Sequence, residues 1–534
     1  DRHLFKYHAL KWLYPDRDRQ NASMHAAQQR DLFMQDIAAR DELAACITNV
    51  PPKSLYARWL YNETIQFFRL GGAGRPKKDK QRLVQLYQEL DCLQNQYLLN
   101  IQEERPLSEN LLLLNQIART RNIIALILGY ENWVEMKADE QGWKTNNSGI
   151  LRQLYQNIPK IRKMTQPVVT DALLYKKTKD PHASMVYDYD ITAYLRMSNQ
   201  ENTSYLTSSD YMPFNQTLFR ALSIFSCLLN VKTELVPNAQ TYAPGVLLFR
   251  VSDPATGMTQ GWFYLDLNAR PLKINEWMTT YIGTAELDDN GKKQPSTPVF
   301  IVSGLIKHDK PEKRFTTEDY SLLFHELGHV YTRIISSSQV SLSPPSPIPM
   351  ELTEASSHLF EYLACTPEIL GIITASDPSY AIQTVTHNPS KLCSDPFSNE
   401  NLWNLAHDLV IGILDLQYAQ SPQSISFGER YRTLLYESTG VSATDEGGYL
   451  LRHPHLAGTN AGNYWVYPMG RLYALAIYSR FKNDNVLNKT TWTDFSRNIL
   501  IPEDQNMSAY ERIMQFLNND TCTRGNSWSY VPQC

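Results

Sequence analysis

Two histidines and a glutamate stand at helical spacing inside an otherwise apolar segment of the chain. His325 and His329 are four residues apart, so on a helix they project from one face, and Glu326 lies beside them. Apolar residues recur at helical spacing around this motif, which predicts a largely buried helix over residues 315–335. Two imidazoles and a carboxylate are costly to bury without partners, and a metal ion is such a partner. The sequence therefore predicts a core helix that carries a metal site.

The residue types of this motif suit a zinc hydrolase. Imidazoles at this spacing can bind one Zn²⁺, and Glu326 can accept a proton from a water molecule bound to the metal. Zinc hydrolases keep three protein ligands and leave the fourth position to water. A second predicted helix, residues 350–364, holds three candidates for the third ligand: Glu351, Glu354 and Glu361. Glu354 and Glu361 lie about two turns apart on one face, and Glu351 is within four residues of that face, so spacing alone leaves all three open.

Helical periodicity covers most of the remaining chain, and strand signals are confined to one region. The clear strands are residues 246–252 and 262–267, joined by a turn typical of a hairpin, and residues 298–304 are a candidate third strand. We therefore expect a mainly α protein with one small antiparallel sheet near the zinc helix. A chain of 534 residues exceeds what one core usually supports. We expect an N-terminal helical region over residues 1–130 and a catalytic region over residues 131–534, with lobes interleaved in sequence.

A glutamate follows the metal motif at a distance that is found in a known family. Glu354 lies 25 residues after His329, in the sequence Leu-Thr-Glu-Ala-Ser-Ser. This arrangement resembles the thimet oligopeptidase/neurolysin family of zinc metallopeptidases. The resemblance implies that Glu354 is the third ligand, with His325 and His329, of one Zn²⁺ per chain.

Two more blocks resemble the same family in the same order. His455 opens a His-Leu-Ala-Gly segment, and Tyr464 and Tyr467 follow it by nine and twelve residues, in register with the tyrosines of the family. Residues 261–270 are similar to the family's Phe-Tyr-Leu-Asp-Leu strand. A weaker match is the segment Leu-Gly-Tyr-Glu-Asn-Trp at residues 128–133, and with it the blocks cover about residues 122–481. The chain is shorter than most relatives, and the shortfall lies at the N-terminus.

The resemblance implies a peptidase of short peptides in which two helical lobes flank a deep substrate channel. By this resemblance Glu326 is the general base, and Tyr467 donates to the oxyanion of the tetrahedral intermediate. His455 is implied as a catalytic and substrate-binding residue, and Tyr464 as a substrate contact. At residues 459–460 the family has a glycine and a tyrosine in place of threonine and asparagine, which leaves one substrate contact in question.

Two other functions are compatible with the same zinc site. A peptidyl-dipeptidase or carboxypeptidase would bind the C-terminal carboxylate of its substrate with a cationic side chain, which the sequence does not place. A catalytically silent peptide-binding protein would keep the fold, but the intact metal motif and both tyrosines speak against it. The sequence indicates neither the physiological substrate nor the oligomeric state.

Composition argues against some partners and bears on the compartment. The net charge is −4 without a basic face, which argues against nucleic-acid binding. No apolar run approaches the roughly 18 residues of a membrane span, so we expect no transmembrane segment. Seven cysteines are too few for a disulfide scaffold, but Cys522 and Cys534 bracket a C-terminal tail that a disulfide would tie down. Together with Asp1 as the first residue, this favours an exported protein, secreted or periplasmic, over the cytoplasmic location of many family members.

Overall fold

Two compact units make up the fold of the computed structural model. Unit 1 comprises residues 1–28, 199–401 and 469–534, and unit 2 comprises residues 29–198 and 402–468. The predicted boundary between an N-terminal and a catalytic region is a different division of the chain and stays a prediction. The residues that the structure describes are 10, 13–49, 55–140, 143, 147–201, 212–274, 276–287, 293–306, 314–337, 348–374, 396–422, 426–443, 450–458, 460–502 and 507–518.

Unit 1 contains one five-stranded sheet with the strand order β1-β2-β3-β5-β4. The three predicted strands correspond to β2, β3 and β5, and the prediction of one small sheet is confirmed, but the prediction that all its strands pair antiparallel is wrong. Neighbouring strands pair antiparallel except β3 and β5, which run parallel. The sheet is therefore mixed, because β4 lies between β3 and β5 in the sequence and pairs with β5 at the edge. The strands are β1 (Lys232–Leu235), β2 (Leu247–Ser252), β3 (Thr259–Asn268), β4 (Met278–Leu287) and β5 (Lys293–Ile306).

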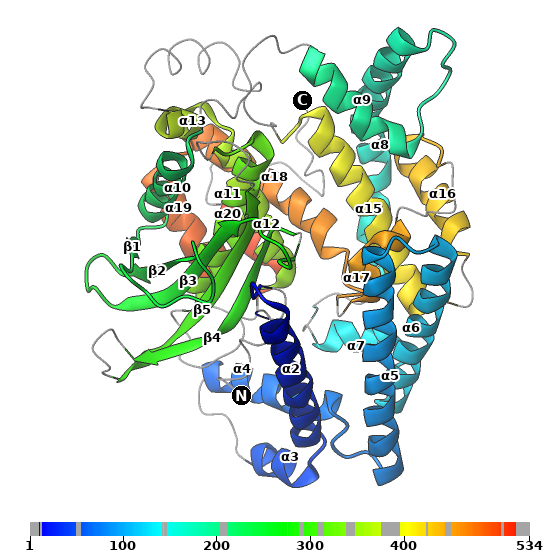
Figure 1. The fold of residues 1–534 in the computed structure, drawn as a ribbon, viewed down its shortest axis with the longest axis vertical. Coiled ribbons are helices and arrows are strands. Elements are labelled where there is room, and N and C mark those ends of the chain that lie inside the picture. Colours follow the sequence, from blue (N-terminus) through cyan, green and yellow to red (C-terminus); the bar gives the residue numbers. More distant parts are fainter. Residues whose placement is uncertain are drawn as a thin grey trace. The chain divides into compact units, whose positions relative to one another are not determined.

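Helices α11 and α12 carry the metal motif and pack against each other beside this sheet (Figure 1). Helix α11 spans Thr317–Ser337, close to the predicted range, and α12 spans the predicted Met350–Ala364. Gly328 permits their close approach, because a Cβ atom there would lie 3.0 Å from the Cα atom of Ser357 on α12. The other helices that lie entirely in unit 1 are α10 (Phe214–Leu228), α13 (Pro367–Thr374), α19 (Lys489–Phe495), η4 (Ser496–Leu500) and α20 (Ala509–Asn518).

An aromatic cluster joins these helices to the sheet. The ring of Phe225 on α10 lies 4.9 Å from that of Tyr331 on α11 and 4.4 Å from that of Phe360 on α12. On the sheet side, Phe263 of β3 lies 5.9 Å from Tyr331 and 5.2 Å from Phe249 of β2. All five rings are buried. Large aromatic rings contribute much of the apolar area of a core, so this cluster fixes α11 on the sheet.

Unit 2 is mainly helical, so the prediction of a mainly α protein is confirmed. Its own helices are α3 (Asp41–Thr48), α4 (Leu55–Leu70), α5 (Lys77–Gln102), α6 (Leu107–Ile127), α7 (Trp133–Glu140), α8 (Asn147–Lys179), α16 (Phe427–Thr439), η3 (Leu450–Arg452) and α17 (Pro454–Ala457). Four helices begin in one unit and end in the other: α2 (Arg17–Ala38), α9 (Asp188–Glu201), α15 (Asn399–Gln420) and α18 (Val466–Asp484). Within the described ranges, no helix combines the length and the apolar character that a membrane crossing requires. Cys522, Cys534 and Thr459 lie outside the described residues.

Candidate active site

Helices α11 and α12 bring Glu354 to both histidines of the motif. The rings of His325 and His329 project from one face of α11, with centroids 4.8 Å apart. The Oε2 atom of Glu354 lies 3.9 Å from Nε2 of His325 and 3.6 Å from Nε2 of His329. Ligand atoms held tetrahedrally at 2.0–2.1 Å from one Zn²⁺ lie roughly 3.4 Å apart. The donor atoms of these three side chains are therefore arranged closely enough to share one metal ion.

Burial gives these side chains the electrostatic properties of a metal site. It lowers the pKa of His329 well below its ordinary value, which keeps the imidazole in the neutral form that metals bind. It raises the pKa of Glu354, because a buried carboxylate is costly without a cation nearby. A bound metal ion would offset that cost and would use the neutral imidazole as it stands.

Glu326 lies on the same helix with its carboxylate buried. The Oε2 atom of Glu326 has no hydrogen-bond partner within the described part of the chain. The hydroxyl of Thr279 on β4 donates to the backbone carbonyl of Glu326 over 3.0 Å, which ties this turn of α11 to the sheet. Burial raises the pKa of Glu326 and so makes its carboxylate a better proton acceptor. A buried carboxylate with a raised pKa next to a metal group is suited to general-base catalysis.

Glu361 contacts the opposite nitrogen of the His325 ring. Its Oε2 atom lies 3.3 Å from Nδ1 of His325 and 2.9 Å from Nδ1 of His358. Burial opposes the ionisation of Glu361, but the hydrogen bonds from the two imidazoles hold its pKa well below the ordinary value. When Nδ1 of His325 donates to Glu361, Nε2 keeps its lone pair for a metal. Carboxylates commonly orient metal-binding histidines in this way.

The structure separates the three glutamates that spacing left open. Only Glu354, among the described glutamates, groups with both histidines of the motif as potential metal ligands. Glu351 is in neither described ligand group, and burial raises its pKa to about 7. His358 is a candidate that the sequence reasoning missed, although it follows Glu354 by one helical turn and precedes Glu361 by three residues. The signal was the helical spacing, which places all three side chains on one face of α12.

The other predicted site residues cluster in unit 2, between α17 and the start of α18. Nε2 of His455 and the hydroxyl of Tyr467 are 2.9 Å apart. The hydroxyl of Tyr464 donates to Oδ1 of Asp408 over 3.1 Å, and the rings of Tyr464 and Tyr467 lie 4.8 Å apart. Burial lowers the pKa of His455 to about 4, so its imidazole is neutral near pH 7. Asp408 and the neighbouring His453, whose ring lies 5.0 Å from that of His455, are members of this cluster that the sequence did not reveal.

Several known proteins that are similar to this chain are peptidases. The family model of peptidase family M3 matches residues 93–502. Oligopeptidase A of Salmonella typhimurium is 23% identical over 73% of this chain and 58% of its own length, and a thimet-like oligopeptidase of Dictyostelium discoideum is 20% identical over 77% and 63%. The chain thus spans less than two thirds of the length of these relatives.

Solved structures share the fold of the whole chain. PZ peptidase A, solved with an inhibitor, has a TM-score of 0.57 at 13% identity and covers 97% of this chain and 91% of its own. A carboxypeptidase of Pyrococcus furiosus has a TM-score of 0.58 at 12% identity and covers 97% of both chains. At such identities the likeness concerns the fold.

Proposed function

Because the chain belongs to peptidase family M3, we propose that it is a zinc-dependent oligopeptidase that hydrolyses peptide bonds in short peptides. The observation that carries this proposal is the approach of Glu354 to both imidazoles of the His-Glu-Leu-Gly-His motif. The buried carboxylate of Glu326 lies in the same motif, and its Oε2 atom has no hydrogen-bond partner among the described residues. Ligands and base are thus supplied together by two packed helices.

The donor set favours zinc among the common metals. His325, His329 and Glu354 would supply two nitrogens and one oxygen, and such a three-ligand set leaves a fourth tetrahedral position for water. When bound, zinc lowers the pKa of that water and polarises the scissile carbonyl. Glu361 holds the His325 ring in the orientation that this binding requires.

Glu326 moves the proton in this proposal. Its carboxylate takes one proton from the attacking water and later delivers it to the nitrogen of the leaving amine. The water oxygen forms a new bond to the carbonyl carbon, and the carbon–nitrogen bond breaks as the nitrogen takes up the proton from Glu326. The products are a carboxylic acid and an amine, and the acid then passes its remaining proton to the amine, which gives a carboxylate and an ammonium group. The burial of Glu326 supports this role, because a raised pKa favours proton uptake near neutral pH.

Tyr467 is proposed to stabilise the oxyanion of the tetrahedral intermediate. In this arrangement the neutral His455 donates its Nε2–H to the tyrosine oxygen, and the hydroxyl of Tyr467 would donate to the oxyanion when the substrate is bound. His455 would then position Tyr467 and also contact the substrate. The hydroxyl of Tyr464 donates to Asp408 and is therefore not assigned as the oxyanion donor. Tyr464 is instead proposed to contact the substrate.

A pair of matched peptides tests this function against the carboxypeptidase alternative. We expect a C-terminally amidated peptide and its free-acid twin to be cut at the same internal bonds at similar rates, because an oligopeptidase does not require the terminal carboxylate. Mass-spectrometric mapping of the products is the measurement. Cleavage of the free acid alone, two residues or one residue from its end, would instead establish a peptidyl-dipeptidase or carboxypeptidase. If zinc-loaded protein cleaves neither peptide, the result would support the alternative of a catalytically silent peptide-binding protein.

The contact of Glu361 with His325 gives a prediction about metal affinity. We expect Glu361→Gln to weaken zinc binding about tenfold, at the low end of the range for loss of an orienting carboxylate, because the amide holds His325 less strongly. Competition with a chromogenic chelator measures the affinity. Glu351→Gln is the matched control, since Glu351 is a partly buried glutamate on the same helix outside the ligand groups. Equal affinities in the two variants would show that Glu361 does not orient the ligand.

A further inference from the structure

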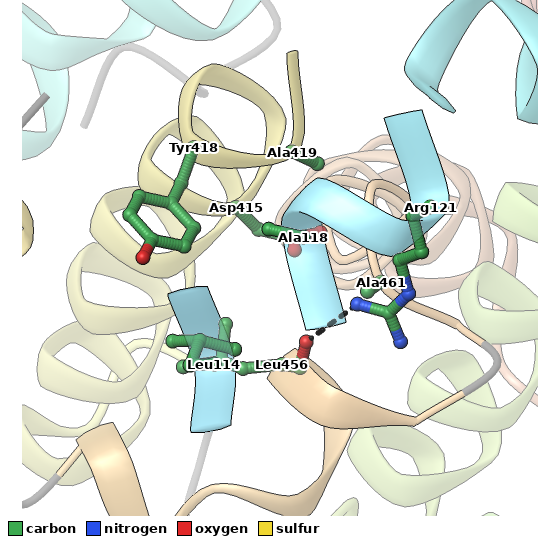
Figure 2. A pocket seen from close by; sticks show the side chains of 8 residues that line it. All are labelled: Leu114, Ala118, Arg121, Asp415, Tyr418, Ala419, Leu456 and Ala461. Atoms are coloured by element: carbon green, nitrogen blue, oxygen red, sulfur yellow. Dashed lines mark hydrogen bonds between the residues drawn. The ribbon is translucent and has the colours of Figure 1, made fainter. Parts of the chain in front are cut away.

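Buried side chains of unit 2 form hydrogen bonds with the backbone of the segment that carries His455. Arg121 of α6 donates through Nη1 to the carbonyl of Leu456 over 3.0 Å (Figure 2). Its Nη2 atom donates to the carbonyls of Ala457 and Gly458. These three carbonyls lie at the C-terminal end of the short helix α17. One guanidinium therefore fixes the backbone directly after His455.

Asp415 of α15 accepts hydrogen bonds from the other end of the same segment. Its Oδ2 atom accepts the backbone N–H of Gly462 over 2.8 Å and that of Tyr464 over 3.0 Å. Gly462 has a φ of +80°, a conformation that side-chain-bearing residues rarely adopt, so the turn is shaped to present both N–H groups to one carboxylate. Trp133 of α7 adds a third contact, because its Nε1–H donates to the carbonyl of Ala461 over 3.0 Å.

The two ionisable groups are buried yet charged. Arg121 is 2% exposed and Asp415 is 4% exposed. Burial lowers the pKa of Arg121 to about 10 and raises that of Asp415 to about 6, so both groups carry their charges near pH 7.5. Buried charges are costly unless they are well hydrogen-bonded, and here the backbone of one segment supplies the bonds. Hydrogen bonds to charged groups are roughly twice as strong as neutral ones, so the segment is held firmly.

The space between these groups is too small for a substrate. Figure 2 shows Arg121 and Asp415 beside Leu114, Ala118 and Tyr418, and the cavity that they line holds about one water molecule. The polar side chains are thus directed to the backbone of the chain itself. The cavity therefore has no room for a ligand, and the function of Arg121 and Asp415 at this point is to hold the backbone by hydrogen bonds.

We propose that Arg121 and Asp415 are positioning residues of the reaction, which hold the backbone at residues 456–458 and at Gly462 and Tyr464 so that His455, Tyr464 and Tyr467 keep one arrangement. The inference rests on the proposed function in that it takes these three side chains to act on the substrate. A catalytic group displaced by about 1 Å can lose roughly 10²-fold in rate, so an effect from residues that do not touch the substrate is expected.

Three variants and one control test this inference in the full-length, zinc-loaded protein. Arg121→Met removes all of the guanidinium bonds, Arg121→Lys keeps the charge with fewer donors, and Asp415→Asn keeps an acceptor without the charge. Arg512→Met is the matched control: Arg512 is fully buried in unit 1 and donates to the carbonyls of Ile499 and Met507 over 3.2 Å and 3.3 Å. It removes a buried arginine of the same kind away from the segment.

We expect a local loosening with a loss of turnover. Hydrogen exchange of peptides covering residues 456–467 should become faster in Arg121→Met and Asp415→Asn, while α11 and α12 keep their protection and their zinc. For Arg121→Met, kcat should fall roughly 10–100-fold with a smaller change in KM. Arg121→Lys should recover part of both losses. The control should lower the melting temperature and leave kcat and the exchange of residues 456–467 unchanged.

The outcomes distinguish two claims: that Arg121 and Asp415 hold the backbone of the segment, and that the segment acts in catalysis. Unchanged exchange over residues 456–467 in Arg121→Met and Asp415→Asn would overturn the proposal. Faster exchange with unchanged kcat would overturn the positioning role, provided that Tyr467→Phe impairs turnover. If Tyr467→Phe is also fully active, the proposed catalytic function of the segment is wrong, whereas the claim that Arg121 and Asp415 hold its backbone is retained. If Arg121→Met does not fold, the same readings are taken from Arg121→Lys and Asp415→Asn.

Discussion

Glu326→Gln protein is expected to bind zinc like the wild type and to lose kcat roughly 10²–10⁴-fold, the usual contribution of a general base. Glutamine is nearly isosteric with glutamate but cannot accept a proton from the attacking water. The buried Oε2 atom of Glu326 has no partner within the described residues, so the substitution breaks no contact of the folded chain there. Steady-state kinetics on a fluorogenic peptide and elemental analysis of the same sample are the measurements.

Glu318→Gln is the matched control for this experiment. Glu318 lies in the first turn of the same helix, away from the motif, so its variant should keep both zinc and activity. A Glu326→Gln enzyme that retains more than about a tenth of the wild-type kcat would contradict the assignment of the general base.

Tyr467→Phe is expected to lower kcat by roughly 10²–10³, the scale set by removal of one oxyanion donor, with KM nearly unchanged. The interaction is made mainly in the transition state, so its loss falls on kcat. The 2.9 Å contact with Nε2 of His455 supports this assignment, because it holds the hydroxyl in a fixed orientation. Kinetics of the variant over a range of substrate concentrations separates kcat from KM.

Tyr464→Phe provides the comparison within the same cluster. Its hydroxyl donates to Asp408, so we expect a smaller loss, seen mainly in KM. If Tyr467→Phe shows an unchanged kcat, this tyrosine only packs, and the oxyanion must be stabilised by zinc and other groups.

The sequence predicted the centre of the fold better than its edges. Helix α12 has its predicted bounds, and α11 is shifted by two residues, because strong apolar periodicity marks buried helices. Strands β1 and β4 were missed, and they are the two edges of the sheet. Three of the four residues of the short β1 are polar, and the described side chains of β4 are only half buried, so neither strand shows a clear apolar pattern. The parallel pairing of β3 with β5 depends on the path of the chain in space, which no local pattern records.

The candidate site divides in the same way. His325, His329 and Glu354 were predicted because their spacing is fixed by helices and by the family resemblance, and the structure brings them together. His358 was missed because only glutamates were considered on this helix, although its spacing from Glu354 and Glu361 places all three side chains on one face. Buried residues that bind backbone, such as Arg121, give no signal in a sequence, since their partners lie more than 300 residues further along the chain.

The metal content of active protein tests the central claim most directly. Elemental analysis of purified wild-type protein should find one zinc per chain, and the activity should disappear on chelation and return when one equivalent of zinc is added. Glu354→Ala should contain less zinc under the same conditions, because a methyl group replaces a ligand oxygen. Active protein without a stoichiometric transition metal, or a Glu354→Ala variant with full zinc and full activity, would contradict the account.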